Sequence, residues 1–197
     1  MQLRGFARLL GKTVVAPSLL VGAILAGGSV LAPLTGNTWL SATAYAANAD
    51  HTSLRLLKEV VPGADSFSDK EGEPPVYKAY RTNESTGEKE LIGYAFVTPD
   101  VPPERNGYSG TIDTLIGMDL EGTIVGLKVI YYKESHRYTI GDFFSWGFEG
   151  QYIGKNAKDR LSIGRDIDGI AKATISAKAA AWGIRQTIRA VAEAYIN

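Results

Sequence analysis

Four strand-like segments with short connections constrain the fold of this chain more than any other feature. They cover residues 76–81, 91–98, 111–120 and 123–132, and the last of them is rich in Ile, Val and Tyr, which favour strands. Strands joined by short connections pair mainly in antiparallel fashion. We therefore expect a mainly antiparallel sheet with one well-buried face.

Helices are expected before and after these segments. A short helix is predicted over residues 50–61, with Thr52 or Ser53 as its N-cap. Residues 65–75 are polar and rich in Gly and Pro, which predicts a loop. The last helix is predicted over about 176–195, where alanines in the first turns let it lie close to the sheet. The fold class is α+β, a mainly antiparallel sheet flanked by helices.

An aromatic-rich stretch precedes the last helix. Asp142 is expected to cap a short helix that runs to about Tyr152. Aromatic side chains at this density indicate core packing, and the alternative is the wall of a cofactor site. The aromatic residues are Phe143, Phe144, Trp146, Phe148 and Tyr152.

The N-terminal stretch has the pattern of an export segment. Arg4, Arg8 and Lys12 precede an apolar run over 14–34, and Ala-Tyr-Ala at 44–46 fits signal-peptidase cleavage. The apolar run also approaches the length of a membrane anchor.

Residues 1–46 are therefore expected to be a signal peptide or a membrane anchor, and residues 47–197 the working domain. The positive flank stays in the cytoplasm in either case. The domain is thus expected in the periplasm or on the outer face of the cytoplasmic membrane.

Composition excludes several classes of function. The chain has no cysteine, which rules out disulfides and Cys-ligated iron–sulfur clusters. Its two histidines, His51 and His136, are far apart, so a His-based zinc site is not expected. Residues 1–46 hold three of the 21 basic residues and no acidic one, which leaves the remainder at a net charge of −3. We expect no nucleic-acid partner.

The stretch 168–176, just before the last helix, allows two interpretations. Helix N-termini present free N–H groups and the positive end of the helix dipole, so Thr174 marks a candidate phosphate site. Alternatively, Thr174 or Ser176 caps the helix.

Several motifs, in this order and spacing, resemble the FMN-binding domain family, which includes the flavin subunits of the Rnf and Nqr electron-transport complexes. The nearest likeness is to the periplasmic flavin domain of NosR-type regulators of nitrous oxide reductase, and it spans nearly all of residues 52–192. The shared motifs lie at 107–110, 115–119 with Gly122 and Ile124, Glu134, and 168–174; the NosR-like ones lie at 57–64, 75–80, 93–96 and 151–155.

The resemblance implies a cofactor and its attachment. Thr174 falls on the family's acceptor threonine, which a flavin transferase esterifies with FMN phosphate drawn from FAD. Asp168 and Ala173 fall on further positions of the same motif, and Ala171 and Lys172 replace its Ser/Thr and Gly. The Lys172 ammonium can pair with phosphate, whereas a glycine there serves a positive φ or a close approach.

The resemblance also implies flavin contacts outside this motif. Glu134 and Ser135 match a segment near the flavin ring and are expected to hydrogen-bond its edge; the alternative is a solvated strand end. Tyr108 and Gly110 fall on the family's Gly-Tyr-x-Gly motif, and Tyr108 is expected to pack against the sheet.

The predicted function is an exported FMN-binding electron-transfer flavoprotein with membrane or periplasmic redox partners. The alternative is a flavin-free interaction or sensory module that keeps the fold, which the Ala171-Lys172 replacement favours. No nucleophile–base pair and no NAD fingerprint is evident, which favours an electron carrier over an enzyme with its own substrate.

Overall fold

The computed structural model describes residues 52–134 and 141–196, and residues 1–51, 135–140 and 197 lie outside this account. The segment 1–46, Ser135 and both histidines therefore lie outside the described residues. No helix within the described ranges is long and apolar enough to cross a membrane.

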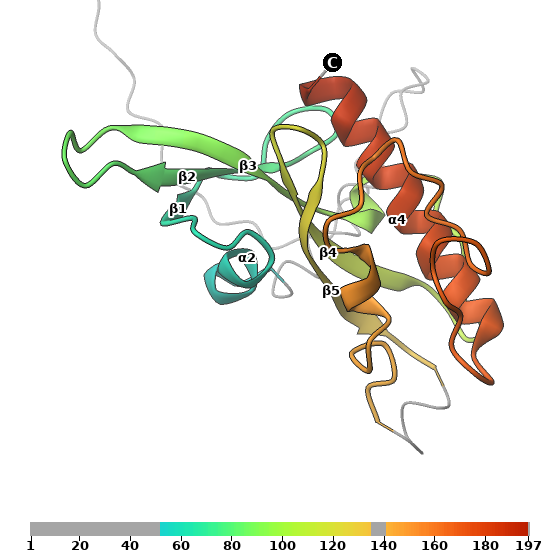
Figure 1. Cartoon of the computed structure of the whole chain (residues 1–197). Helices are drawn as coiled ribbons and strands as arrows, with labels where there is room; N and C mark the ends of the chain where they lie inside the picture. Colours follow the sequence, from blue (N-terminus) through green and yellow to red (C-terminus); the bar gives the residue numbers. More distant parts are fainter. Residues whose placement is uncertain (1–51, 135–140, 197) are drawn as a thin grey trace, which may run out of the picture. The chain divides into compact units, whose positions relative to one another are not determined.

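A five-stranded antiparallel sheet forms the centre of the domain, with the strands in sequence order from β1 to β5 (Figure 1). The α+β prediction is confirmed. The elements are α2 (Leu54–Val60), β1 (Ser66–Phe67), β2 (Tyr77–Thr82), β3 (Lys89–Val97), the 3₁₀ helix η2 (Thr98–Asp100), β4 (Ile112–Asp119), β5 (Ile124–Tyr132), the 3₁₀ helix η3 (Glu149–Tyr152) and α4 (Thr174–Tyr195).

The two faces of the sheet carry separate apolar clusters, because neighbouring residues on a strand point to opposite sides. Phe96 and Ile116 face the cluster that contains α4, whereas Ala95, Val97 and Leu115 face the cluster that contains α2. Helices α2 and α4 therefore cover opposite faces of the sheet. The sequence predicts a sheet with one well-buried face, whereas in the structure both faces are covered.

Helix α2 lies unusually close to the sheet at a pair of glycines. Gly117 on β4 and Gly126 on β5 are partners in register, and a methyl group added to either would overlap the carbonyl oxygen of Val60. Glycine inside a strand often marks such a close approach of another backbone. Ser53 caps the other end of α2, where its Oγ accepts the Leu56 N–H at 3.4 Å.

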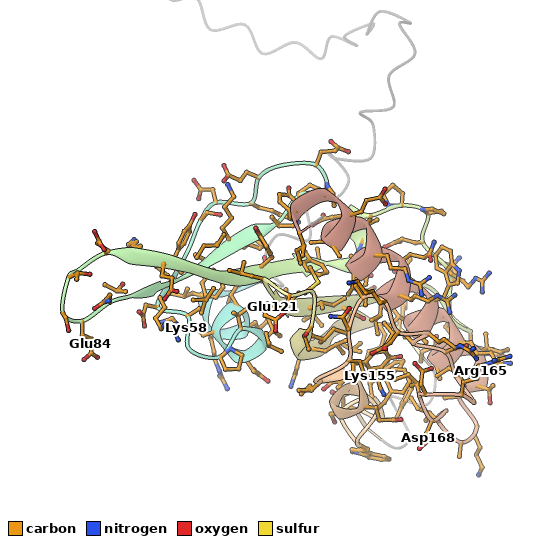
Figure 2. All side chains as sticks on the ribbon, turned by 45° about the horizontal axis from the view of Figure 1, so that its top comes forward. Lys58, Glu84, Glu121, Lys155, Arg165 and Asp168 are labelled. Atoms are coloured by element: carbon orange, nitrogen blue, oxygen red, sulfur yellow. The ribbon has the colours of Figure 1, made fainter. Side chains whose placement is uncertain are left out.

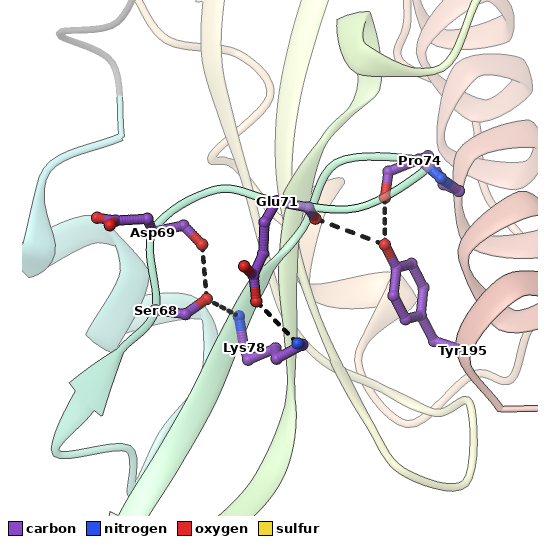
Figure 3. A network of polar contacts seen from close by, with 6 residues as sticks. All are labelled: Ser68, Asp69, Glu71, Pro74, Lys78 and Tyr195. Carbon is purple, nitrogen blue, oxygen red and sulfur yellow. Dashed lines mark hydrogen bonds and ion pairs between the residues drawn. The ribbon is translucent and has the colours of Figure 1, made fainter.

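The C-terminal end of α4 is fixed by the segment that precedes β2 (Figure 3). The Tyr195 hydroxyl donates a hydrogen bond to the carbonyl of Pro74 at 2.7 Å. The Tyr195 ring also lies 5.2 Å from the ring of Tyr94 on β3. In the same network Lys78 pairs with Glu71 at 2.8 Å.

Two local predictions are wrong. The predicted loop 65–75 contains β1, which pairs with β2 and adds a fifth strand. No α-helix runs from Asp142 to Tyr152, because Gly147 adopts a φ of +101° that interrupts helical geometry, and only η3 forms. Asp142 instead accepts a hydrogen bond from the Tyr132 hydroxyl at 2.9 Å. The core-packing interpretation of the aromatic stretch holds for four of its five residues, while Trp146 is exposed.

Gly117→Ala is expected to lower the free energy of unfolding by about 1–3 kcal/mol, because the added methyl displaces the end of α2. Urea denaturation measures this change. Gly150→Ala is the matched control, since an added Cβ there meets no atom within 4 Å. Equal stability of the two variants would contradict the close packing of α2.

Candidate functional site

Helix α4 begins at Thr174 without a side-chain cap. The preceding residue, Ala173, occupies the N-cap position and offers no side-chain acceptor. Ser176 does not cap the helix either, since its Oγ accepts the backbone N–H of Tyr108 at 3.3 Å. The interpretation of Thr174 or Ser176 as an N-cap is therefore wrong. The first turn of α4 keeps the free N–H groups and positive dipole end that attract anions.

A cavity of about 390 Å³ opens at this helix end, and we call it the Thr174 cavity. Its volume lies within the range of about 300–1,000 Å³ that is usual for cofactor clefts. Four residues expected at the site from the sequence besides Thr174 line it. The lining residues are Tyr108, Glu134, Phe143, Lys172, Ala173, Thr174, Ile175 and Ser176.

Glu134 is buried beside this cavity, just beyond the end of β5. Only 4% of its surface is exposed, and its Oε1 accepts the backbone N–H of Ser109 at 3.2 Å. The alternative of a solvated strand end is therefore wrong. Gly107 makes the close packing possible, because a side chain there would collide with Glu134 and Ile112.

Tyr108 lies at the surface and does not pack against the sheet as predicted. Its side chain is 72% exposed, because the turn 107–110 directs it outward while its backbone is held by Ser176. Gly110 closes this turn, its carbonyl accepting the Gly107 N–H at 2.7 Å. Gly110 is not among the residues that line the Thr174 cavity.

Lys172 occupies the left-handed region of backbone conformation, with φ of +65°. A residue with a Cβ adopts this conformation at a cost that glycine does not bear. A glycine, which the motif resemblance implies at this position, would adopt the same conformation without that cost. The exposed Lys172 side chain adds a positive charge to the wall that contains Thr174.

Asp168 lines a different cavity, which shares only Phe143 with the Thr174 cavity. Its backbone is held by Gln151, whose Oε1 accepts the Asp168 N–H at 2.6 Å. Asp168 lies on an exposed loop (Figure 2). The cavity has a volume of about 620 Å³ and is lined by Phe143, Trp146, Gly147, Phe148, Gln151, Asp168, Gly169, Ile170 and Ala171.

Phe143 and Ile175 also line the Thr174 cavity, although the sequence did not single out either one as a flavin contact. Phe143 stood only within an aromatic stretch assigned mainly to the core, and Ile175 carries no chemical signature. A larger cavity, of about 640 Å³, lies toward the opposite end of α4, where Arg189 and Glu193 line it. None of the predicted site residues belongs to it.

Lys172→Gly is expected to leave the free energy of unfolding unchanged or raise it by up to about 1 kcal/mol, because glycine accommodates the positive φ. Lys172→Val is expected to lower it by about 1–2 kcal/mol, since a β-branched residue is strained there. Urea denaturation of the flavin-free chain measures the free energy of unfolding of both Lys172 variants. The reference is Lys178→Gly, which is expected to lower this free energy by about 1 kcal/mol because Lys178 lies inside α4. An equal loss in Lys172→Gly and Lys178→Gly would contradict the left-handed conformation.

A known protein family and several curated proteins match the region that contains this site. The profile of the FMN-binding domain family covers residues 107–189. One relative is a subunit of the proton-translocating ferredoxin:NAD(+) oxidoreductase complex of Clostridium ljungdahlii. It is 27% identical over 144 residues, which are 68% of this chain and 69% of that protein.

Two further relatives are also subunits of oxidoreductase complexes. The one from the ion-translocating oxidoreductase complex of Vibrio atlanticus is 29% identical over 53% of this chain. The one from the Na(+)-translocating ferredoxin:NAD(+) oxidoreductase complex of Acetobacterium woodii is 28% identical over 51%. The matches span about half the length of these two relatives, 51% and 49%.

The profile match extends from the turn that contains Tyr108 through most of α4, and it assigns residues 107–189 of this chain to the FMN-binding domain family, with FMN as the cofactor.

Proposed function

We propose that this chain is an exported electron-transfer flavoprotein in which FMN is esterified to Thr174. One observation carries the proposal: the exposed Thr174 begins an uncapped helix and lines a cavity beside a lysine. The relatives support electron transfer as the role, because each is named as a subunit of an oxidoreductase complex.

The residues of the Thr174 cavity suit the phosphate end of FMN. The free N–H groups of the first turn of α4 and the Lys172 ammonium offer donors and positive charge to a phosphoryl group. Glu134 and Tyr108 line the same cavity and are available to the rest of the cofactor. Bound FMN supplies the ability to accept and pass on electrons, and the protein orients it and sets its electrostatic surroundings.

In the proposed attachment reaction, FAD donates its FMN phosphoryl group to Thr174. The Thr174 hydroxyl loses its proton and forms an O–P bond to the FMN phosphorus, while the diphosphate bond of FAD breaks and AMP leaves. A flavin transferase is the proposed catalyst. The exposure of Thr174 supports this step, since an enzyme must reach its hydroxyl from outside.

The location and partners follow from the N-terminal pattern and the relatives. We propose that residues 1–46 direct or anchor residues 47–197 to the periplasmic side of the membrane. The redox partners are then membrane or periplasmic proteins, as befits relatives that are subunits of ion-translocating complexes. The nearer likeness to NosR-type regulators stays a prediction from the motifs.

The second candidate function is a flavin-free interaction module, and Lys172 is the observation that favours it. A lysine in a left-handed conformation, where the resembling family has glycine, departs from the attachment motif. The experiment that tests the first proposal also separates the two.

Full chain exported together with a flavin transferase is expected to be yellow and heavier by FMN less one water. Thr174→Ala is expected to lose the added mass, because the acceptor oxygen is gone. Intact-mass spectrometry and the visible spectrum measure both properties. Thr86→Ala, which alters an exposed threonine after β2, is the matched control and keeps the added mass.

Retention of the added mass by Thr174→Ala would contradict attachment at this residue. A colourless protein of unmodified mass that also fails to bind added FMN would favour the flavin-free module instead.

A further inference from the structure

A second, smaller cavity lies along α4 and is lined by cationic side chains. We call it the basic cavity; its volume is about 190 Å³. Nitrogen-tipped side chains gather along one side of α4 in Figure 2. The lining residues are Arg105, Leu161, Ser162, Ile163, Lys178, Ala181, Trp182 and Arg185.

Three positive charges meet at this cavity without a carboxylate in its lining. Arg105 comes from the loop before β4, while Lys178 and Arg185 lie two turns apart on α4. None of the three takes part in an ion pair within the described ranges. Asp166, on the neighbouring loop, uses its carboxylate to accept the backbone N–H groups of Leu161 and Ser162, at 2.6 and 2.7 Å.

Two of the cations are held in place by their neighbours. The guanidinium carbon of Arg105 lies 4.9 Å from the centroid of the Trp182 ring. A cation–π contact of this kind restrains the guanidinium, whose N–H donors remain available to another partner. Arg185 donates to the carbonyl of Arg160 at 3.4 Å. The donors are therefore partly ordered before any ligand arrives, which lowers the entropic cost of binding.

The loop that forms the other wall is held in a strained conformation. Leu161 has a φ of +47°, and its side chain is fully buried. Non-glycine residues in the left-handed region concentrate at ligand sites, where the surrounding structure holds them. In the described chain the two such residues are Lys172, at the Thr174 cavity, and Leu161, at the basic cavity.

We propose that the basic cavity binds a small, multiply charged oxyanion, a phosphate or a compact phosphorylated molecule. Arginine edges match the oxygen geometry of phosphate, and an anion relieves the repulsion among three cations gathered in one cavity. The volume, below the ~300 Å³ at which most ligand clefts begin, restricts the ligand to one phosphoryl group or a diphosphate with little else attached.

The basic cavity is distinct from the Thr174 cavity. The two share no lining residue, although both use α4. The proposal therefore holds whether or not FMN is attached to Thr174.

Calorimetric titration of the full chain with inorganic phosphate and with pyrophosphate, at low ionic strength, tests the proposal. We expect saturable binding at the basic cavity, tighter for pyrophosphate than for phosphate. Arg105→Gln and Arg185→Gln are each expected to weaken binding by about tenfold or more, because each removes a charged donor. Circular dichroism verifies that both variants are folded.

One control locates the binding. Arg81→Gln removes an exposed cation that pairs with Glu90 at 3.1 Å on the β2–β3 hairpin, and it is expected to leave the affinity unchanged. The proposal would be overturned by folded Arg105→Gln and Arg185→Gln variants that bind as tightly as the unaltered chain, by an equal loss of affinity in Arg81→Gln, or by the absence of saturation.

Discussion

Helix α4 packs against the sheet through alanines, and the Thr174 cavity and the basic cavity both depend on that contact. Ala177, Ala180 and Ala181 are buried to 3% exposure or less, and such small side chains let the helix axis approach the strands closely. Larger residues further along, Ile184 and Ile188, then fill the core. The helix is consequently held along its length, and its uncapped N-terminus has a defined position beside Glu134 and the turn 107–110.

Two residues with a positive φ, Leu161 and Lys172, shape the walls of the basic cavity and the Thr174 cavity. Lys172 lies just before α4 and adopts a left-handed conformation. Leu161 also adopts a left-handed conformation, at the point where its loop lies beside α4. Each conformation is unfavourable for an isolated residue and persists because neighbouring contacts fix it. Asp166 supplies such contacts for Leu161 through its hydrogen bond to the backbone of that residue. Lys172 and the start of α4 contribute positive charge to the Thr174 cavity, and Arg105, Lys178 and Arg185 contribute it to the basic cavity.

The sequence predicts much of this architecture and part of the site. The strand-like segments and their short connections locate β2 to β5, and the alanine-rich run locates α4 to within two residues of its start. The family resemblance brings together Tyr108, Glu134 and Thr174, which are far apart in the chain and line one cavity. The outward direction of Tyr108 depends on a backbone hydrogen bond to Ser176, which no local pattern reveals.

Other features depend on contacts that the sequence order hides. The absence of an α-helix after Asp142 depends on the backbone of Gly147, and β1 is too short to show a strand pattern. The basic cavity is built from three separate segments and has no motif of its own. Asp168, which belongs to the same motif as Thr174, lines a separate cavity, and Gln151 holds its backbone there.

The proposed attachment at Thr174 is tested most directly by locating the flavin on protein that is produced together with a flavin transferase. Trypsin cleaves after Lys172 and Lys178, so the peptide 173–178 contains both hydroxyl candidates at the start of α4. Fragmentation of this peptide by mass spectrometry is predicted to place the FMN phosphoester on Thr174. A flavin on Ser176 or on another peptide, or a peptide 173–178 that is never modified in the presence of an active flavin transferase, would contradict it.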